Sequence, residues 1–306
     1  MKHWILAARL RTLPLSVSGI IVGSAYAYFQ NPDAFDVAIL VFALLTTLSL
    51  QILSNYANDY GDGIKGTDRN RIGEKRMVAS GIITAKQMKN AVLIFTLLTL
   101  IFAVALIYIS FGKDNFGLSL LFFLLGIGSV GAAIKYTVGS NAYGYSGFGD
   151  LAVFVFFGWV SVIGSNFLYV HHLDWKLFLV AISIGLLSVA VLNLNNMRDI
   201  ENDTIAGKNT LVVKLGLNKA KKYHYLLLIC ATLLLMVFEI ILKLQGLVGI
   251  LCIILFTNHL FFVKNTTNPK EFDSQLKIVA IGTFFISLAF FINIVFLSNW
   301  IKSVFN

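Results

Sequence analysis

Charged residues are scarce in this sequence. They form 13% of the 306 residues, whereas 58% are hydrophobic. A water-soluble domain carries about 25% charged residues. A larger core does not remove this shortage, because a surface in water still needs ionised groups to cover it. The composition therefore excludes an ordinary soluble domain and favours a chain embedded in a bilayer.

Cysteine and proline are also rare, at two and three residues. Cys230 and Cys252 both lie in apolar segments, with no partner at a metal-binding spacing. We interpret them as small apolar residues in helix contacts, so neither a disulfide nor a cysteine metal centre is expected. Because proline is scarce, few helices need to kink at that residue.

Long apolar runs are what the sequence has in abundance. A helix crosses about 30 Å of hydrocarbon with roughly 17–25 apolar residues. Nine runs qualify, at 13–29, 37–57, 89–110, 116–136, 147–170, 177–197, 223–244, 247–263 and 276–300. The fourth and fifth are rich in glycine, so we expect less regular helices there. The pattern predicts an all-α polytopic membrane protein, in which residues 1–306 form one domain of nine transmembrane helices around a cytoplasm-facing cavity.

Lys and Arg are distributed unevenly between the two sides of the predicted bundle. All but four of the 24 lie at the N-terminus or in the loops after spans two, four, six and eight. The positive-inside rule then places the N-terminus in the cytoplasm and the C-terminus outside, as an integral protein of a bacterial cytoplasmic membrane. This topology also accounts for the net charge of +9. We therefore expect membrane lipid, and no nucleic acid, as a partner.

Two polar clusters follow the second and sixth spans. In the first, within the motif loop 55–88, Asn55, Asp59 and Asp62 share one face if the helix continues. The second lies in the motif loop 195–222 and places an Asn or Asp at 195, 199 and 203. The clusters start 140 positions apart, and each ends the second span of a group of four. This weak internal repeat predicts that both clusters converge on one cavity.

Carboxylates near a bilayer cost several kcal/mol unless they are paired, solvated or bound to metal. Oxygen ligands without nearby His or Cys favour Mg²⁺, which binds one or two carboxylates together with substrate phosphate oxygens. Solvated residues at helix ends are the alternative, and the paired clusters argue against it. The predicted metal ligands are Asp59, Asp62, Asp199 and Asp203, and three of them, Asp59, Asp199 and Asp203, are predicted to be catalytic.

Cationic and amide side chains accompany the acids, as expected for a pocket that binds a metal-bridged diphosphate. The predicted substrate-binding residues are Asn55, Asn58, Lys65, Asp68, Arg76, Tyr136, Asn195, Arg198 and Lys208. For Tyr136, a role as an interfacial aromatic residue is an equal alternative. Arg11 is better explained as a topological anchor than as an acceptor-binding group.

The sequence resembles the UbiA-type superfamily of intramembrane prenyltransferases over nearly its whole length. Within it, the likeness is greatest to the 1,4-dihydroxy-2-naphthoate polyprenyltransferase branch of menaquinone synthesis. Four stretches carry the resemblance: 9–14 (RLRTLP), 58–68 (NDYGDGIKGTD), 136–149 (YTVGS and YGYSGFG) and 195–211 (NNMRDIEND and AGKNTL). One departure concerns the general first motif, Asn-x₃-Asp-x₃-Asp, whose last position is Gly63 here. Whether Asp62 or Asp68 ligates the metal is therefore open.

The resemblance implies nine transmembrane helices and two Asp-rich motifs after helices two and six. It also implies Mg²⁺-dependent transfer of a polyprenyl group from a polyprenyl diphosphate to 1,4-dihydroxy-2-naphthoate. That reaction releases CO₂ and diphosphate and yields demethylmenaquinone. Prenyl chain length, oligomeric state and closure of loop 61–85 over the site do not follow from the sequence.

Three alternatives stay open at this point. Another branch of the superfamily would use a different aromatic or lipid acceptor. A cation-coupled transporter would keep its acids near the bilayer midplane, with helices broken in the middle of spans two and six. A scaffold would bind lipid diphosphates without turning them over.

Overall fold

The structure is a computed structural model that describes residues 1–67, 75–244 and 246–297. Within these residues no β-strand occurs, and nine helical segments are long and apolar enough to cross a membrane. Their bounds are Lys2–Gln30, Val37–Lys65, Ala85–Phe111, Phe116–Lys135, Gly149–Val170, Trp175–Arg198, Leu217–Ile241, Leu247–Asn265 and Pro269–Phe296. The all-α fold and the predicted spans are confirmed, with shifted boundaries.

Six of these segments are single α-helices: α3 (Val37–Lys65), α4 (Ala85–Phe111), α5 (Phe116–Lys135), α8 (Trp175–Arg198), α11 (Leu217–Ile241) and α12 (Leu247–Asn265). The other three are composite, built from α1 (Lys2–Ala8), η1 (Leu10–Thr12) and α2 (Leu13–Gln30), from α6 (Gly149–Val153), η4 (Phe154–Gly164) and α7 (Ser165–Val170), and from η5 (Pro269–Glu271), α13 (Phe272–Ile292) and η6 (Asn293–Leu297). Shorter connecting helices are η2 (Pro32–Ala34), η3 (Tyr143–Tyr145), α9 (Ile200–Ile205) and α10 (Leu211–Leu215).

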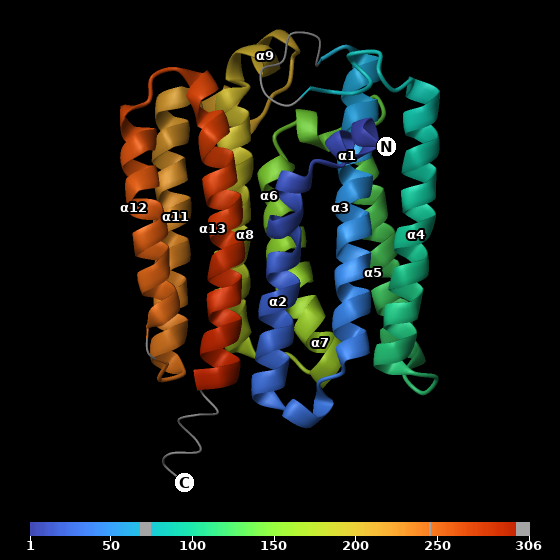
Figure 1. The fold of residues 1–306 in the computed structure, drawn as a ribbon, viewed down its shortest axis with the longest axis vertical. Helices are drawn as coiled ribbons and strands as arrows, with labels where there is room; N and C mark the ends of the chain where they lie inside the picture. The colour runs from blue at the N-terminus through green and yellow to red at the C-terminus, as the bar shows by residue number, and fades with distance from the viewer. Residues whose placement is uncertain (68–74, 245, 298–306) are drawn as a thin grey trace.

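The long helices run side by side and form a bundle (Figure 1). Helices α11, α12 and α13 lie on one side, α3, α4 and α5 lie on the other, and α2, α6 and α8 lie between them. Helix α9 and the end of α3 share one end of the bundle. We call this the motif end, because both polar clusters belong to it.

Helices α3 and α8 carry the two clusters and are unbroken in their middle. Asp36 begins α3 by accepting a hydrogen bond from the Ala38 N–H (2.7 Å), and Gly66 ends it in the left-handed region (φ 74°). The helix therefore continues eight residues beyond the predicted end of the span at 57. The residues of the first cluster were expected to share one face if the helix continued, and the helix does continue.

The fifth span is irregular, as its glycines predicted, whereas the fourth is a regular α-helix. Residues Phe154–Gly164 form a π-helix, a geometry often found at functional sites. Gly158 lets this segment approach α8 closely: a Cβ added there would lie 2.6 Å from the Ala181 carbonyl oxygen and 3.0 Å from the Gly185 Cα. The absence of a side chain at 158 thus fixes the π-helix against α8.

Glu239 is an acid buried within α11, and its side chain serves the fold. Its carboxylate accepts hydrogen bonds from the backbone N–H groups of Val248 and Gly249 and from the Asn293 amide, each at 2.9 Å. The first N–H groups of α12 lack partners within their own helix, so Glu239 satisfies two of them. A carboxylate with this set of partners is stable without a ligand.

Substituting Gly158 with Ala is expected to lower the free energy of unfolding by about 1–3 kcal/mol, because backbone atoms on α8 cannot yield to the new Cβ. Thermal unfolding in detergent micelles measures this as a lower Tm. The matched control is Gly128→Ala on α5, where an added Cβ meets nothing within 4 Å. Equal Tm values for the two variants would show that the α8 contact does not limit stability.

Candidate active site

A cavity of about 740 Å³ lies within the bundle, and both polar clusters line it. At the motif end its walls carry amide, carboxylate and ammonium groups, which belong to Asn55, Asn58, Asp62, Asn195, Asn196, Asp199, Asp203 and Lys208. Away from that end the walls are mostly apolar and include Phe122, Phe156 and Leu168. The prediction that the two clusters converge on one cavity is confirmed.

The first cluster contributes Asn55, Asn58 and Asp62 to the cavity wall. Asp62 is buried, with 3% of its surface exposed. Asn58 accepts a hydrogen bond from the Thr137 hydroxyl (3.1 Å), so α3 fixes its amide against the loop after α5. Asn58 and Asp62 are four residues apart on a continuous helix and therefore lie on one face.

Asp59 occupies a different position from the predicted one. Its two carboxylate oxygens accept hydrogen bonds from the backbone N–H groups of Met77 and Val78, both at 3.0 Å. It is 1% exposed and does not contribute to the cavity wall. The neighbouring Arg76 does line the cavity. The carboxylate of Asp59 thus holds the segment that presents Arg76, a geometry that does not favour a metal role for Asp59.

The second cluster brings Asn195, Asp199 and Asp203 to the cavity wall, as predicted. Asp203 follows one turn after Asp199, because the Asp203 N–H donates to the Asp199 carbonyl (2.8 Å) across the junction of α8 and α9. Both carboxylates are buried, each at 5% exposure. The two acids are therefore stacked on one side of the cavity.

Arg198 lies outside the cavity wall, although it was predicted to bind substrate. Its guanidinium donates to both carboxylate oxygens of Asp199 (2.7 Å each), to the Asn195 amide oxygen (2.8 Å) and to Asp273 (2.6 Å). The side chain is fully buried. Three of these contacts fix the orientation of Asp199 and Asn195, and the fourth ties the guanidinium to Asp273, so Arg198 holds the second cluster in place.

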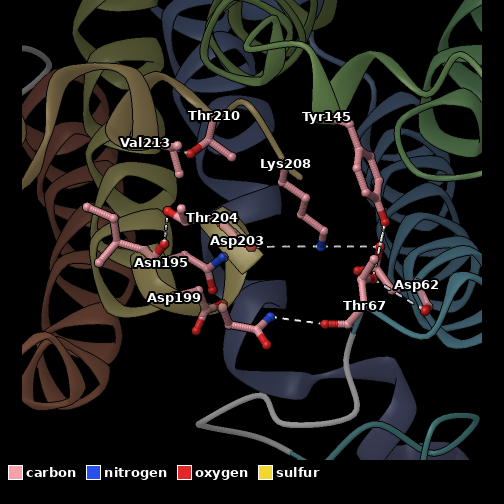
Figure 2. A network of polar contacts seen from close by, with 12 residues as sticks. Asp62, Thr67, Tyr145, Asn195, Asp199, Asp203, Thr204, Lys208, Thr210 and Val213 are labelled. Atoms are coloured by element: carbon pink, nitrogen blue, oxygen red, sulfur yellow. Dashed lines mark hydrogen bonds and ion pairs between the residues drawn. The ribbon is translucent and has the colours of Figure 1, made fainter. Parts of the chain in front are cut away.

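Lys208 connects the two clusters. Its Nζ lies 3.4 Å from Asp62 Oδ1 and 3.9 Å from Asp203 Oδ1, between acids from opposite halves of the sequence (Figure 2). A second bridge runs from the Asn202 amide to the Thr67 carbonyl oxygen at 3.0 Å. The ammonium group offsets the repulsion between the carboxylates, and it comes close to both.

Tyr145 is a central residue of this network and is absent from the predicted site. Its hydroxyl donates to Asp62 Oδ1 at 2.5 Å (Figure 2), and the ammonium groups of Lys65 and Lys208 lie 4.1 and 4.8 Å from the centre of its ring. Its backbone carbonyl accepts the Asn209 N–H (2.9 Å). The sequence signal was its place in the run YGYSGFG, where a tyrosine between Gly144 and Ser146 does not reveal these partners.

The remaining predicted residues have mixed positions. Tyr136 and Arg76 line the cavity. Burial, with a smaller effect from nearby Asp150, raises the pKa of Tyr136 above its ordinary value, so its hydroxyl stays protonated. Lys65 donates to the Thr137 carbonyl (2.8 Å) and is not part of the cavity wall. Asp68 lies outside the described residues.

The donor set has the chemistry of a hard divalent cation site. Carboxylate and amide oxygens face the cavity, and no His or Cys is found among its described lining residues. In the described part of the chain no three acidic, His or Cys side chains converge closely enough to hold a metal alone. Such a set fits a cation that also takes water and phosphate oxygens, as Mg²⁺ does. The residues therefore fit a metal shared with a phosphate-bearing ligand.

The geometry bears on the transporter alternative. The acids lie at the ends of α3 and α8, and both helices are continuous through the middle of the bundle. The broken helices and midplane acids that transport would require are not seen in spans two and six as far as the structure describes them. The arrangement instead joins an end that carries acidic and basic side chains to an apolar compartment.

Known proteins share both the sequence and the fold. The chain is 42% identical to a 1,4-dihydroxy-2-naphthoate octaprenyltransferase from Escherichia coli (strain K12), over 98% of this chain and 96% of the relative. It is 41% identical to a protein of the same name from Haemophilus influenzae, over 95% and 94% of the two chains. The fold matches the structure of a UbiA homolog from Archaeoglobus fulgidus bound to GPP and Mg²⁺, with a TM-score of 0.67 at 15% identity, over 94% of this chain and 99% of that chain. Residues 16–295 match the UbiA prenyltransferase family, and the chain belongs to that family.

Proposed function

We propose that this protein transfers a polyprenyl group from a polyprenyl diphosphate to 1,4-dihydroxy-2-naphthoate in a bacterial cytoplasmic membrane. The observation that carries the proposal is the cavity, in which an acidic and cationic end continues into an apolar compartment. A polyprenyl diphosphate has the same two-part chemistry, with a charged head and a long apolar tail. The names of the two bacterial relatives support the choice of acceptor.

The proposed metal is Mg²⁺, as in the Archaeoglobus fulgidus homolog. Asp62, Asp199 and Asp203 would hold it, with amide oxygens of Asn58 and Asn195 as neighbours. When bound, the ion supplies positive charge that stabilises the departing diphosphate. Asn58 and Asp62 repeat the Asn-x₃-Asp spacing of Asn195 and Asp199, and all four line the cavity.

Cationic side chains complete the diphosphate site in this proposal. Lys208, already placed between Asp62 and Asp203, donates to the phosphate oxygens, and the buried Arg76 adds a guanidinium at the cavity wall. Arg198 and Asp59 act indirectly. The first orients Asp199, and the second holds the backbone that follows Arg76.

The reaction needs no oxidant. The bond between the allylic carbon and oxygen breaks, and its electron pair leaves with diphosphate. The electron-rich naphthoate ring supplies the pair for the new carbon–carbon bond. The acceptor carboxylate leaves as CO₂, and its electron pair returns to the ring, which gives demethylmenaquinone in its reduced form. The apolar walls keep water from the allylic cation, and aromatic faces can stabilise it.

The direct test is an assay in membranes with Mg²⁺, a labelled polyprenyl diphosphate and a panel of aromatic acids. We expect labelled product and released diphosphate with 1,4-dihydroxy-2-naphthoate, and none after chelation of divalent ions. Product with 4-hydroxybenzoate alone would assign the protein to another branch. Binding of prenyl diphosphate without release of diphosphate from any acceptor would favour the scaffold alternative.

The roles of the two neighbouring acids can be separated by a pair of matched variants. Asp62→Asn should lower kcat by about 100- to 1,000-fold with an unchanged Tm, because it weakens the hold on the proposed metal, whose positive charge stabilises the departing diphosphate. Asp59→Asn should lower the Tm and reduce kcat by roughly tenfold or less, because it weakens the hold on Met77 and Val78. If Asp59→Asn is as inactive as Asp62→Asn at an unchanged Tm, Asp59 is a metal ligand after all.

Removing the hydroxyl of Tyr145 tests its contact with Asp62. Tyr145→Phe keeps the ring beneath Lys65 and Lys208 but loses the 2.5 Å hydrogen bond. A hydrogen bond to a charged group is worth about 1.5–3 kcal/mol, so we expect roughly a tenfold or larger fall in kcat/KM. Steady-state kinetics with varied Mg²⁺ measures it, and a higher Mg²⁺ requirement should accompany the loss. Activity equal to wild type would show that Asp62 needs no such support.

A further inference from the structure

The chain turns sharply between α1 and η1, at Arg9. The backbone of Arg9 is in the left-handed region, at φ 51° and ψ 67°. This conformation costs a non-glycine residue roughly 1–2 kcal/mol and persists only where the surroundings enforce it. Strain of this kind often accompanies a functional side chain.

The surroundings that enforce the turn belong to the first cluster. The Asn55 amide donates to the Ala8 carbonyl oxygen (2.8 Å) and to the Thr12 hydroxyl (3.2 Å), and the Thr12 hydroxyl donates to the Arg9 carbonyl oxygen (2.9 Å). Asn55 therefore fixes the turn on both sides of Arg9. The amide nitrogen of the buried Asn55 is therefore used by the fold, whereas the sequence predicted a contact with substrate.

The side chain of Arg9 lines the cavity, and its Nη2 is buried without a hydrogen-bond partner. No hydrogen bond or ion pair joins this side chain to the residues that the structure describes. Two other cations of the cavity wall lie close to acids and show the contrast: Arg11 contacts Asp273 at 3.4 Å, and Lys208 contacts Asp62 at 3.4 Å. A buried guanidinium donor is costly to leave unpaired, so the cavity is built to receive an anionic group beside Arg9.

Two anionic groups enter the cavity in the proposed reaction, namely the diphosphate and the acceptor carboxylate. The diphosphate already has Lys208 and the proposed metal-binding acids, of which Asp62 lies at the end of α3. The turn at Arg9 is attached to Asn55. Asn55 lies seven residues before Asp62 on α3, which corresponds to about 10 Å along the helix axis. We infer that Arg9 binds the carboxylate of the aromatic acceptor, an inference that rests on the proposed function. A guanidinium suits this ligand because its planar N–H groups match the two carboxylate oxygens.

Kinetics with both substrates tests this role in the full-length protein. Arg9→Gln should raise the KM for 1,4-dihydroxy-2-naphthoate about 10- to 100-fold, the loss expected for a charge-assisted pair, and leave the KM for prenyl diphosphate unchanged. Arg9→Lys should recover part of the affinity. Two inhibitors isolate the carboxylate: the variant should bind 1-hydroxy-2-naphthoate more weakly than wild type does, and bind 1-naphthol equally well.

Arg9→Gly controls for folding. Glycine adopts the left-handed conformation freely, so this variant should keep or raise the Tm while it shows the same KM defect. A higher KM for prenyl diphosphate with an unchanged acceptor KM would assign Arg9 to the diphosphate and overturn the inference. Unchanged values for both substrates would overturn it as well. Failure of the wild-type protein to use 1,4-dihydroxy-2-naphthoate would instead contradict the proposed function, whatever the Arg9 variants do.

Discussion

The ion pairs of Lys208 with Asp62 and Asp203 are the contacts on which the site depends. They join the end of α3 to the segment after α8, so two clusters far apart in sequence become one set of donors. Carboxylates this deeply buried repel one another, and a single ammonium offsets part of that repulsion. A metal with a diphosphate brings further charge of both signs. Lys208 thus holds the acids of the two clusters together on one cavity wall.

Partners distinguish the acids that stabilise the fold from those that serve the cavity. Glu239 and Asp59 are as buried as Asp62, yet their carboxylate oxygens accept backbone N–H groups. Such a carboxylate fixes a loop or helix start and has little capacity for a ligand. Asp62 and Asp203 instead meet side chains that can move, above all Lys208. In a bundle surrounded by lipid, this difference in partners tells more about function than burial does.

The sequence predicted the helices and the two clusters because both depend on local patterns. Apolar length sets a span, and four-residue spacing sets a helix face. The choice among neighbouring acids is not local. In the first cluster an Asn precedes an Asp by four residues twice, as Asn55 with Asp59 and as Asn58 with Asp62. The two pairs are distinguished by the hydrogen bonds that Asp59 accepts from Met77 and Val78, which lie 18 and 19 residues later in the sequence.

The same limit explains Arg198, Tyr145 and Arg9. Arg198 stands beside Asp199 in sequence, but its contact with Asp273, 75 residues away, turns it into a support for the cluster. Tyr145 gains its role from Asp62, 83 residues earlier. In the sequence, Arg9 is one more basic residue at a membrane boundary. In the structure, Asn55 on another helix fixes the backbone turn at Arg9. Partners of this kind come from packing between helices. Such contacts cannot be predicted from one unaligned sequence. In this family member, contacts between helices determine which side chains take part in the site, whereas the apolar composition of the sequence determines where the helices lie along the chain.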